Sequence, residues 1–408
     1  MAAIGWIDFS RKDRNRVSSI LDLLRPEGQV DELGIGTLRD GLANSLFPGI
    51  STIQTRAKYF FIIPYILQDF LQLPVTDRKK KMPTYYLENE EYEVMWDLAD
   101  KYNHQEGHGV IGISKYRARK EKIARRPSEI YWNGLNVMKC LDSKGLSAAA
   151  FLNKANKNNQ ETLIHYKTVD GEGDDKDAGF YNYFNIKVPI NKNWKTNLDL
   201  NLTTIEAEFL RDNMIDIKDS VLSLVVSNEN IYSEFNTTDK FIDFARISYS
   251  EISNEQLKSN VILAHDFAIL MQGAHIAYNQ ELQKQFCEAD CFEENWNKWY
   301  DSFEQNMINY QAFNVEDLFV HANTTRAYTR DFVRDWFKLL KAETLDLQKK
   351  AELIRNQEWR AKNKKARLKY NKKDKIEEGK AIGLGLLDFR FRSAKIIVKD
   401  IKEGLKNA

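Results

Sequence analysis

The clearest pattern of apolar and polar positions lies near the N-terminus, in the segment DELGIGTLRDGLANSLFPGISTIQTRAKYFFIIPYI of residues 31–66. Apolar residues recur at three- and four-residue steps through residues 35–46, which predicts a helix. After a Phe-Pro-Gly turn, the apolar face of residues 53–61 predicts a second helix, with Ser51 as its N-cap. This second helix would begin with four polar side chains, which we call the polar segment: Gln54, Thr55, Arg56 and Lys58.

The polar segment has two interpretations. In a helix-turn-helix, the start of the second helix contacts base edges, where Gln reads adenine and Arg reads guanine. A plain antiparallel helical hairpin has the same pattern, and its polar side chains would cap the helix or pair with nearby carboxylates, Asp31, Glu32 and Asp40. Exposure of the polar segment would favour DNA binding, whereas its burial against acidic residues would favour a structural role.

Helical periodicity extends over most of the chain, so we expect a mainly α, multi-helical protein with a few short strands. Changes of composition predict four stretches: an N-terminal helical domain with the hairpin (1–80), a mixed, winged-helix-like domain (85–220), a helical middle (221–345), and a basic helix followed by a closing helix (346–408). Thr203, with Glu206 three positions later, matches the sequence pattern of a capping box at the start of a helix. Gly134, inside a predicted helix, indicates either close packing at that position or a weak helix prediction.

Composition limits the classes of protein that fit. The 60 Lys and Arg residues balance the 59 Asp and Glu residues, so any attraction for a charged partner must come from local clusters. Three cysteines argue against a disulfide framework and indicate a reducing compartment. No apolar run approaches the ~18 residues of a membrane span, and no signal peptide is recognisable. We therefore expect a cytoplasmic protein without membrane contact.

Two local clusters of basic residues stand out against this balance. Seven cations and one acid lie between Ser114 and Pro127, and Tyr116, Tyr131 and Trp132 add aromatic rings for stacking. The candidate nucleic-acid-binding residues of this cluster are Lys115, Arg117, Arg119, Lys120, Lys122, Arg125 and Arg126. Residues 355–375 hold ten basic and two acidic residues, and their candidates are Lys362, Lys364, Lys365 and Lys369.

Catalytic and metal-binding patterns are weaker. Asp31, Glu32 and Asp40 with Lys58 could serve as the carboxylates and lysine of a metal-dependent nuclease. Cys287 and Cys291 have no neighbouring third and fourth ligand for zinc, and the six histidines lack a metal-binding spacing on a convincing helix. We predict no metal or other cofactor.

Eight blocks of the sequence carry a family resemblance. They are WIDFS, DELGIGTLRD, LFPGISTIQTRAKYFFIIPYI, GVIG, RPSEIYW, LTTIEAEFL, MQGAHIAYN and DFRFRSAKIIVKDIKEGL. In this order they resemble an uncharacterised bacterial domain-of-unknown-function family, number 6361, over nearly the full length. The closing block differs from the family pattern, with Phe389 and Phe391 where Tyr and Trp are usual. The resemblance implies a place among prokaryotic anti-phage defence genes, near helicases and nucleases, and it assigns no catalytic residues.

Three hypotheses follow. The main one is a nucleic-acid-binding accessory component of a prokaryotic defence system, without enzymatic activity, which holds nucleic acid (DNA as the expected form) while a separate helicase or nuclease acts. The second is a structural adaptor that binds only protein partners. The third is a metal-dependent nuclease that uses the Asp31, Glu32, Asp40 and Lys58 block.

Overall fold

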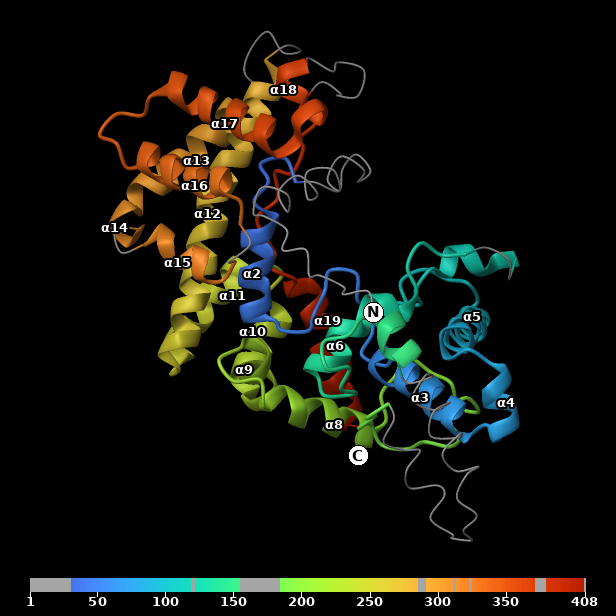
Figure 1. Ribbon diagram of the computed structural model, residues 1–408. Helices are drawn as coiled ribbons and strands as arrows, with labels where there is room; N and C mark the ends of the chain where they lie inside the picture. The colour runs from blue at the N-terminus through green and yellow to red at the C-terminus, as the bar shows by residue number, and fades with distance from the viewer. Residues whose placement is uncertain are drawn as a thin grey trace, which may run out of the picture. The chain divides into compact units, whose positions relative to one another are not determined.

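The computed structural model describes residues 31–118, 122–154, 184–284, 291–310, 313–322, 325–370 and 379–406. Within these ranges the protein is mainly helical, as predicted (Figure 1). The described part contains one isolated antiparallel bridge, between Leu141 and Ile186, and no β-sheet. A winged-helix module, which requires paired strands, is therefore not confirmed.

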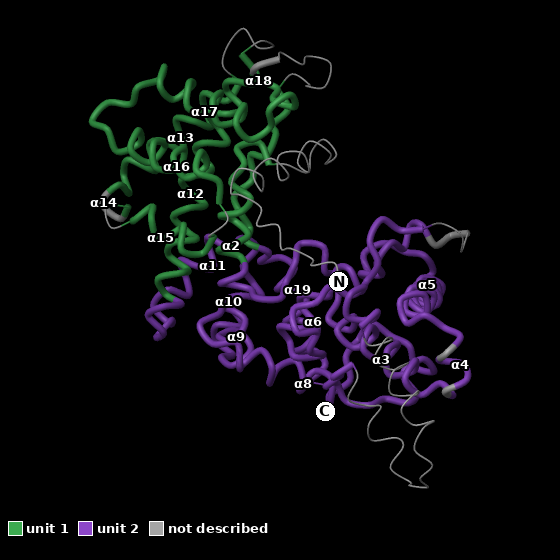
Figure 2. Tube along the Cα trace, viewed as in Figure 1, with its two compact units in different colours: residues 1–43, 258–389 green, residues 44–257, 390–408 purple. Residues whose placement is uncertain are grey.

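The chain forms two compact units, each assembled from separate parts of the sequence (Figure 2). Unit 1 comprises residues 1–43 and 258–389, and unit 2 comprises residues 44–257 and 390–408. These units do not coincide with the four stretches predicted from the sequence. The closing helix near the C-terminus belongs to the same unit as residues 44–257.

Unit 1 is built around a long helix, α12, which starts at the unit boundary. Its helices are α2 (Gly36–Leu46, which ends in unit 2), α12 (Glu255–Gln283), α13 (Glu293–Gln305), α14 (Met307–Tyr310), α15 (Val315–Val320), α16 (Ala327–Leu340), α17 (Leu347–Lys362) and α18 (Arg367–Tyr370), with a 3-10 turn at Asn363–Lys365. Two tryptophans donate to α12 carbonyls: Trp299 to Ile269 at 3.1 Å and Trp336 to Leu270 at 3.0 Å.

The close approach of Trp299 to α12 depends on a glycine. A Cβ atom at Gly273 would lie 2.2 Å from the Trp299 ring. By length and composition α12 could also cross a membrane, but 78% of its apolar window is buried inside the protein. Because the core helix of a globular unit has the same properties, this pattern is weak evidence for a membrane span.

Unit 2 contains most of the sequence blocks of the family resemblance. Its helices are α3 (Tyr59–Gln72), α4 (Val75–Lys80), α5 (Pro83–Lys101), α6 (Pro127–Val137), α8 (Thr204–Ile215), α9 (Val221–Ser227), α10 (Glu229–Thr237), α11 (Phe241–Ser248) and α19 (Phe391–Lys406), with 3-10 turns at Ile113–Ala118 and Tyr249–Glu251. Helix α19 packs on α8, where a Cβ at Gly404 would lie 2.8 Å from the Ala207 side chain.

A cluster of phenylalanines fixes the start of α19 in unit 2. Phe391, which is fully buried, contacts the rings of Phe47, Phe235, Phe241 and Phe244 at centroid distances of 4.8–6.2 Å. Such aromatic contacts each contribute roughly 0.5–1.5 kcal/mol beyond burial of their area. Phe391 is thus part of a cluster of five phenylalanines.

The second helix of the predicted hairpin starts later than the sequence pattern indicated. Helix α3 begins at Tyr59, so residues 47–58 form an irregular connection after α2. A helix-turn-helix has a turn of about three or four residues, and is therefore not confirmed here. The prediction that Ser51 is the N-cap is wrong, because the polar groups of this connection bond to other parts of unit 2 rather than to helical neighbours.

Candidate functional site

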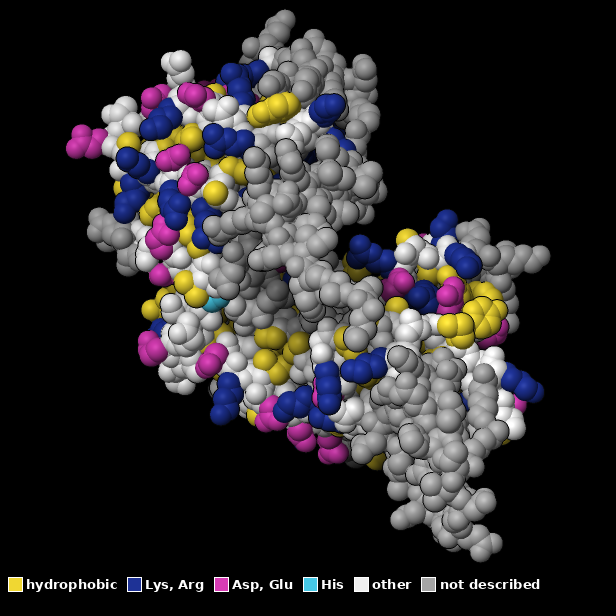
Figure 3. Space-filling model, in the orientation of Figure 1, with side chains coloured by type: hydrophobic (Ala, Val, Ile, Leu, Met, Phe, Trp, Pro, Cys, Tyr) yellow, Lys and Arg dark blue, Asp and Glu magenta, His cyan; other side chains and the backbone are white. Residues whose placement is uncertain are grey.

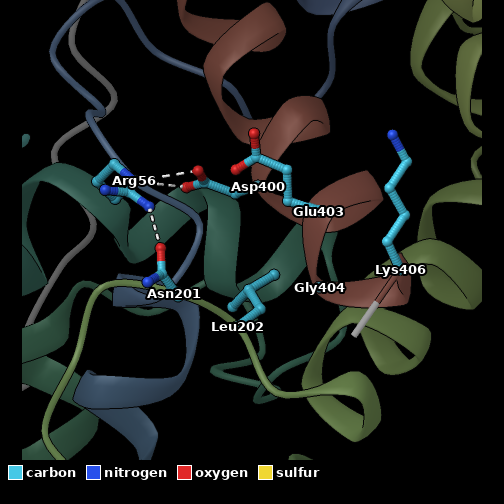
Figure 4. A pocket seen from close by; sticks show the side chains of 7 residues that line it. All are labelled: Arg56, Asn201, Leu202, Asp400, Glu403, Gly404 and Lys406. Carbon is cyan, nitrogen blue, oxygen red and sulfur yellow. Dashed lines mark hydrogen bonds and ion pairs between the residues drawn. The ribbon is translucent and has the colours of Figure 1, made fainter. Parts of the chain in front are cut away.

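Arg56 is the most highly connected side chain of the polar segment. Its Nε donates to both carboxylate oxygens of Asp400, at 3.0 and 2.9 Å (Figure 4). Its Nη1 donates to the His108 carbonyl at 3.1 Å, and its Nη2 donates to the Leu200 carbonyl at 3.3 Å and to Asn201 Oδ1 at 3.1 Å. Arg56 thus connects the 47–58 segment, the loop that follows α5, the segment before α8, and α19.

Asp400 is more deeply buried than its partner Arg56. Its side chain is 6% exposed, and it also accepts the backbone N–H of Ala57 at 2.7 Å. Burial raises the pKa of Asp400, although the hydrogen bond and charge of Arg56 oppose the shift. Burial alone would lower the pKa of Arg56, but the hydrogen bond and charge of Asp400, together with the charges of Tyr102 and Glu403, make the net shift upward. The pair therefore has the properties of a structural ion pair.

The small pocket beside this ion pair does not form a binding site. It has a volume of about 310 Å³ and includes Asn201, Glu403 and Lys406 besides Arg56 and Asp400. Figure 4 shows that the Lys406 side chain points away from Arg56, so the two cations do not converge on one position. The Asp400 oxygens are already occupied by Arg56 and Ala57.

Lys58 forms a second buried ion pair. Its Nζ lies 2.7 Å from both carboxylate oxygens of Glu206, and Tyr65 donates its hydroxyl to the same carboxylate at 3.0 Å. Glu206 also accepts the Thr203 N–H at 2.8 Å, which completes the predicted capping box of α8. The side chain of Lys58 is 6% exposed, and its ion pair with Glu206 stabilises the contact between the start of α3 and α8.

Gln54 and Thr55 are likewise used inside unit 2. Gln54 is 3% exposed and donates to the Gly49 carbonyl at 3.0 Å. Thr55 donates its hydroxyl to the Gly109 carbonyl at 2.6 Å, and its N–H donates to the Tyr131 hydroxyl at 2.8 Å. A Cβ at Gly134 would lie 2.6 Å from the Gly49 carbonyl oxygen, which confirms the close packing predicted there. The polar segment is thus committed to the fold and does not form an exposed base-reading surface.

Residues 115–126 behave differently from the polar segment. Lys115 and Arg125 are exposed, and the Lys122 side chain is 82% exposed with its Nζ 3.6 Å from Glu88. Arg126, 23% exposed, lies within 3.6 Å of three carboxylates: Glu88, Glu91 and Glu129. The Arg117 side chain and the residues Arg119 and Lys120 lie outside the described part of the chain.

An open groove lies beside these cations, between the start of α5 and the start of α6. This α5–α6 groove has a volume of about 530 Å³ and is lined by Tyr85, Leu87, Glu88, Arg126, Trp132 and Leu152, among others. Tyr85 is 64% exposed, which is unusual for so large an aromatic side chain. In Figure 3, hydrophobic side chains lie among Lys, Arg, Asp and Glu over the α5 region of unit 2.

Glu91 fixes the two walls of the groove to each other. This residue of α5 is 1% exposed and accepts the Ser128 N–H at 2.5 Å and the Ser128 hydroxyl at 3.0 Å, at the start of α6. Burial raises the pKa of Glu91 to about 7, although Ser128 and Arg126 oppose the shift. On the α6 side, Trp132 donates to the Leu146 carbonyl at 2.8 Å, which fixes its ring. The groove is therefore preformed.

The second predicted basic cluster, in unit 1, is partly a buried network. Lys362 is 6% exposed and pairs with Glu32, whose other oxygen accepts from Arg367 at 2.9 Å. The Tyr278 hydroxyl lies 3.1 Å from Glu32 and 3.0 Å from Glu358. Lys364 is exposed and Lys365 is half-buried, whereas the Lys369 side chain lies outside the described part. Lys362 was a candidate for nucleic-acid contact, but its charge is used to neutralise Glu32.

The carboxylates proposed for a nuclease have other roles. Asp31 accepts the N–H groups of Leu33 and Ile35 at 3.0 and 3.2 Å, and half-exposed Asp40 pairs with Arg39 at 3.2 Å. Among the described residues, no group of three or more His, Cys, Asp or Glu side chains could hold a metal ion. Cys291 is disulfide-bonded, which the odd cysteine count did not lead us to expect, and Cys287 lies outside the described residues.

These observations define a mainly helical protein whose buried ion pairs each stabilise the interior of one unit. Exposed cations lie near a groove that contains aromatic side chains. The chain belongs to the family of unknown function DUF6361, whose model matches residues 1–403. Neither a curated protein nor a solved structure is detectably similar to the chain.

Proposed function

We propose that the protein is a nucleic-acid-binding accessory component without catalytic activity, and that it contacts nucleic acid at the α5–α6 groove. The observation that carries the proposal is that Arg126 lines a preformed groove that contains an exposed aromatic ring, while the exposed Lys122 pairs with Glu88 of the same lining and the exposed Arg125 precedes Arg126 in the chain. Cations attract the phosphate backbone, and aromatic rings stack on bases, so this pairing of residue types suits nucleic acid.

The charge around the groove limits the affinity. Arg126 lies beside three carboxylates, those of Glu88, Glu91 and Glu129, and Lys122 lies beside Glu88. A phosphate must compete with these carboxylates for the cations. We therefore expect weak binding that depends strongly on salt and little on sequence.

The wider biological role remains a prediction from the family resemblance. A separate helicase or nuclease of a prokaryotic defence system would supply the chemistry, while this protein holds the strand.

A protein-only adaptor is the second candidate. It is favoured by the burial of Gln54, Arg56 and Lys58, because burial of this segment against Asp400 and Glu206 is what we expected of a structural role. An adaptor would use the α5–α6 groove for an apolar segment of its partner and would show no salt-dependent affinity for nucleic acid.

The experiment is a fluorescence-anisotropy titration of labelled oligonucleotides with the full-length chain at several salt concentrations. In the Lys122→Gln/Arg125→Gln variant, the slope of log affinity against log salt on a single strand should flatten by up to about 1.4, since each phosphate contact contributes about 0.7. The matched control is Lys218→Gln/Arg246→Gln, which removes one lysine and one arginine that are exposed elsewhere in unit 2. Equal slopes for both variants and the wild type would overturn the proposal.

A further inference from the structure

We propose that the α5–α6 groove holds an unpaired base of a single strand, with the Tyr85 ring as its stacking surface. This inference rests on the proposed function and narrows it to single-stranded nucleic acid. It starts from an unusual exposure: Tyr85, in the first turn of α5, leaves 64% of its surface in solvent. A base stacked on an aromatic ring is stabilised by about 1–3 kcal/mol whatever its identity.

The groove has the size and rigidity that a base requires. Its volume of about 530 Å³ lies within the range of ordinary small-ligand sites. Glu91 holds α5 to α6, and the Trp132 ring packs on Phe151 at a centroid distance of 5.6 Å. Because these walls are fixed before binding, little conformational entropy is lost when a flat ligand enters.

The lining of the groove favours an exposed base over a duplex. Leu87, Ala149 and Leu152 supply apolar contacts that suit the face of a base, which a duplex hides within its stack. Lys122 and Arg125 lie on the chain that leads into α6, so the backbone of the same strand would pass beside cations. The Trp132 N–H and the Ser128 hydroxyl are bonded to Leu146 and Glu91, so these two groups are not available for reading a base edge.

The test compares labelled single-stranded and duplex oligonucleotides of the same sequence, with three variants of the full chain. Tyr85→Ala should lower affinity for the single strand at least five-fold, which corresponds to the lower limit for stacking on one ring. Tyr85→Phe should bind within two-fold of the wild type, because the ring is kept. Tyr249→Ala, which removes another exposed tyrosine of unit 2, is the matched control and should bind like the wild type.

The salt slope separates this inference from the proposed function. Tyr85→Ala should leave the slope unchanged, because the phenol ring contacts no phosphate in this arrangement. If Tyr85→Ala binds the single strand like the wild type, or if the wild type prefers the duplex, the inference is wrong while the electrostatic proposal stands. If the wild type binds neither oligonucleotide, both fail and the adaptor hypothesis replaces them.

Discussion

Arg56 offers the sharpest test of the assignment of the polar segment to the fold. Replacing it with Met removes the hydrogen bonds to Asp400, His108, Leu200 and Asn201. The variant also leaves the Asp400 carboxylate, 6% exposed, with only the Ala57 N–H as a partner. The structure thus predicts a loss of stability rather than a direct loss of binding.

The magnitude follows from the burial of the pair. Removing one partner of a buried ion pair costs about 3–5 kcal/mol, because a buried charge remains uncompensated. Arg56 keeps 17% of its side-chain surface in solvent, so we take the lower limit, about 3 kcal/mol. For a unit of this size, such a loss lowers the melting temperature by about 6–12 °C.

The assay is thermal and urea unfolding of the full chain, followed by circular dichroism. Arg211→Met is the control, because Arg211 is a partly exposed arginine of unit 2 that pairs only with its neighbour Asp212. Arg56→Lys should recover little of the stability, since an ammonium group cannot reproduce the fork of donors. A melting temperature for Arg56→Met equal to that of the control would refute the structural role of Arg56.

Three further changes test other parts of the structure. Because the folded pKa of Glu91 (about 7) exceeds its usual 4.5, the folded state binds more protons than the unfolded state between these values, and stability should fall as pH rises from about 5 to 7. In urea unfolding at pH 5 and 8, Glu91→Gln should reduce this fall in stability by up to about 3 kcal/mol. An unchanged pH dependence in the variant would show that Glu91 is not its source. Gly134→Ala should lower the free energy of unfolding by about 1–3 kcal/mol in thermal unfolding, because the added methyl group would overpack against the Gly49 carbonyl. Gly145→Ser is the comparison: its added side chain would meet no neighbouring atom, so that variant tests only the local strain of a positive φ. Lys362→Met should destabilise unit 1 by about 2–3 kcal/mol, because Glu32 loses a partner. Lys364 is exposed, so Lys364→Met should change stability by less than about 1 kcal/mol. Similar losses of stability for the two variants would contradict the buried network around Glu32.

Helices were predictable where the signal is local. Apolar periodicity predicted the mainly α fold, and the spelling of the Thr203 to Glu206 capping box predicted the start of α8. Gly134 indicated close packing, because a glycine inside a helix costs stability unless a neighbour requires the space. Each of these predictions depends on residues within a few positions of each other.

The partners of the polar segment could not be predicted in this way. Asp400 lies 344 residues from Arg56, and Glu206 lies 148 residues from Lys58. An Arg or Lys at a predicted helix start has the same local pattern whether it faces solvent or a distant carboxylate. The expected helix start after Ser51 was wrong for the same reason, since tertiary hydrogen bonds satisfy that backbone instead.

The α5–α6 groove was visible only in part from the sequence. Lys122, Arg125, Arg126 and Trp132 were recognised as a basic and aromatic cluster, whereas Tyr85 and Glu88 were not connected with it. These two residues lie more than thirty positions earlier, where Tyr85 reads as part of a connector and Glu88 as part of an ordinary amphipathic helix. Their contribution depends on how α5 packs beside α6, which no local pattern encodes.

The most direct test of nucleic-acid binding at the groove removes a carboxylate instead of a cation. Glu88 lies 3.6 Å from Lys122 and 3.5 Å from Arg126, so Glu88→Gln should release Lys122 for phosphate and should remove one of the three carboxylates beside Arg126. In salt titrations on a single strand, we predict that this variant binds more tightly than the wild type, with a slope steeper by up to about 1.4. Weaker or unchanged binding by Glu88→Gln, or an affinity that does not depend on salt, would contradict the account.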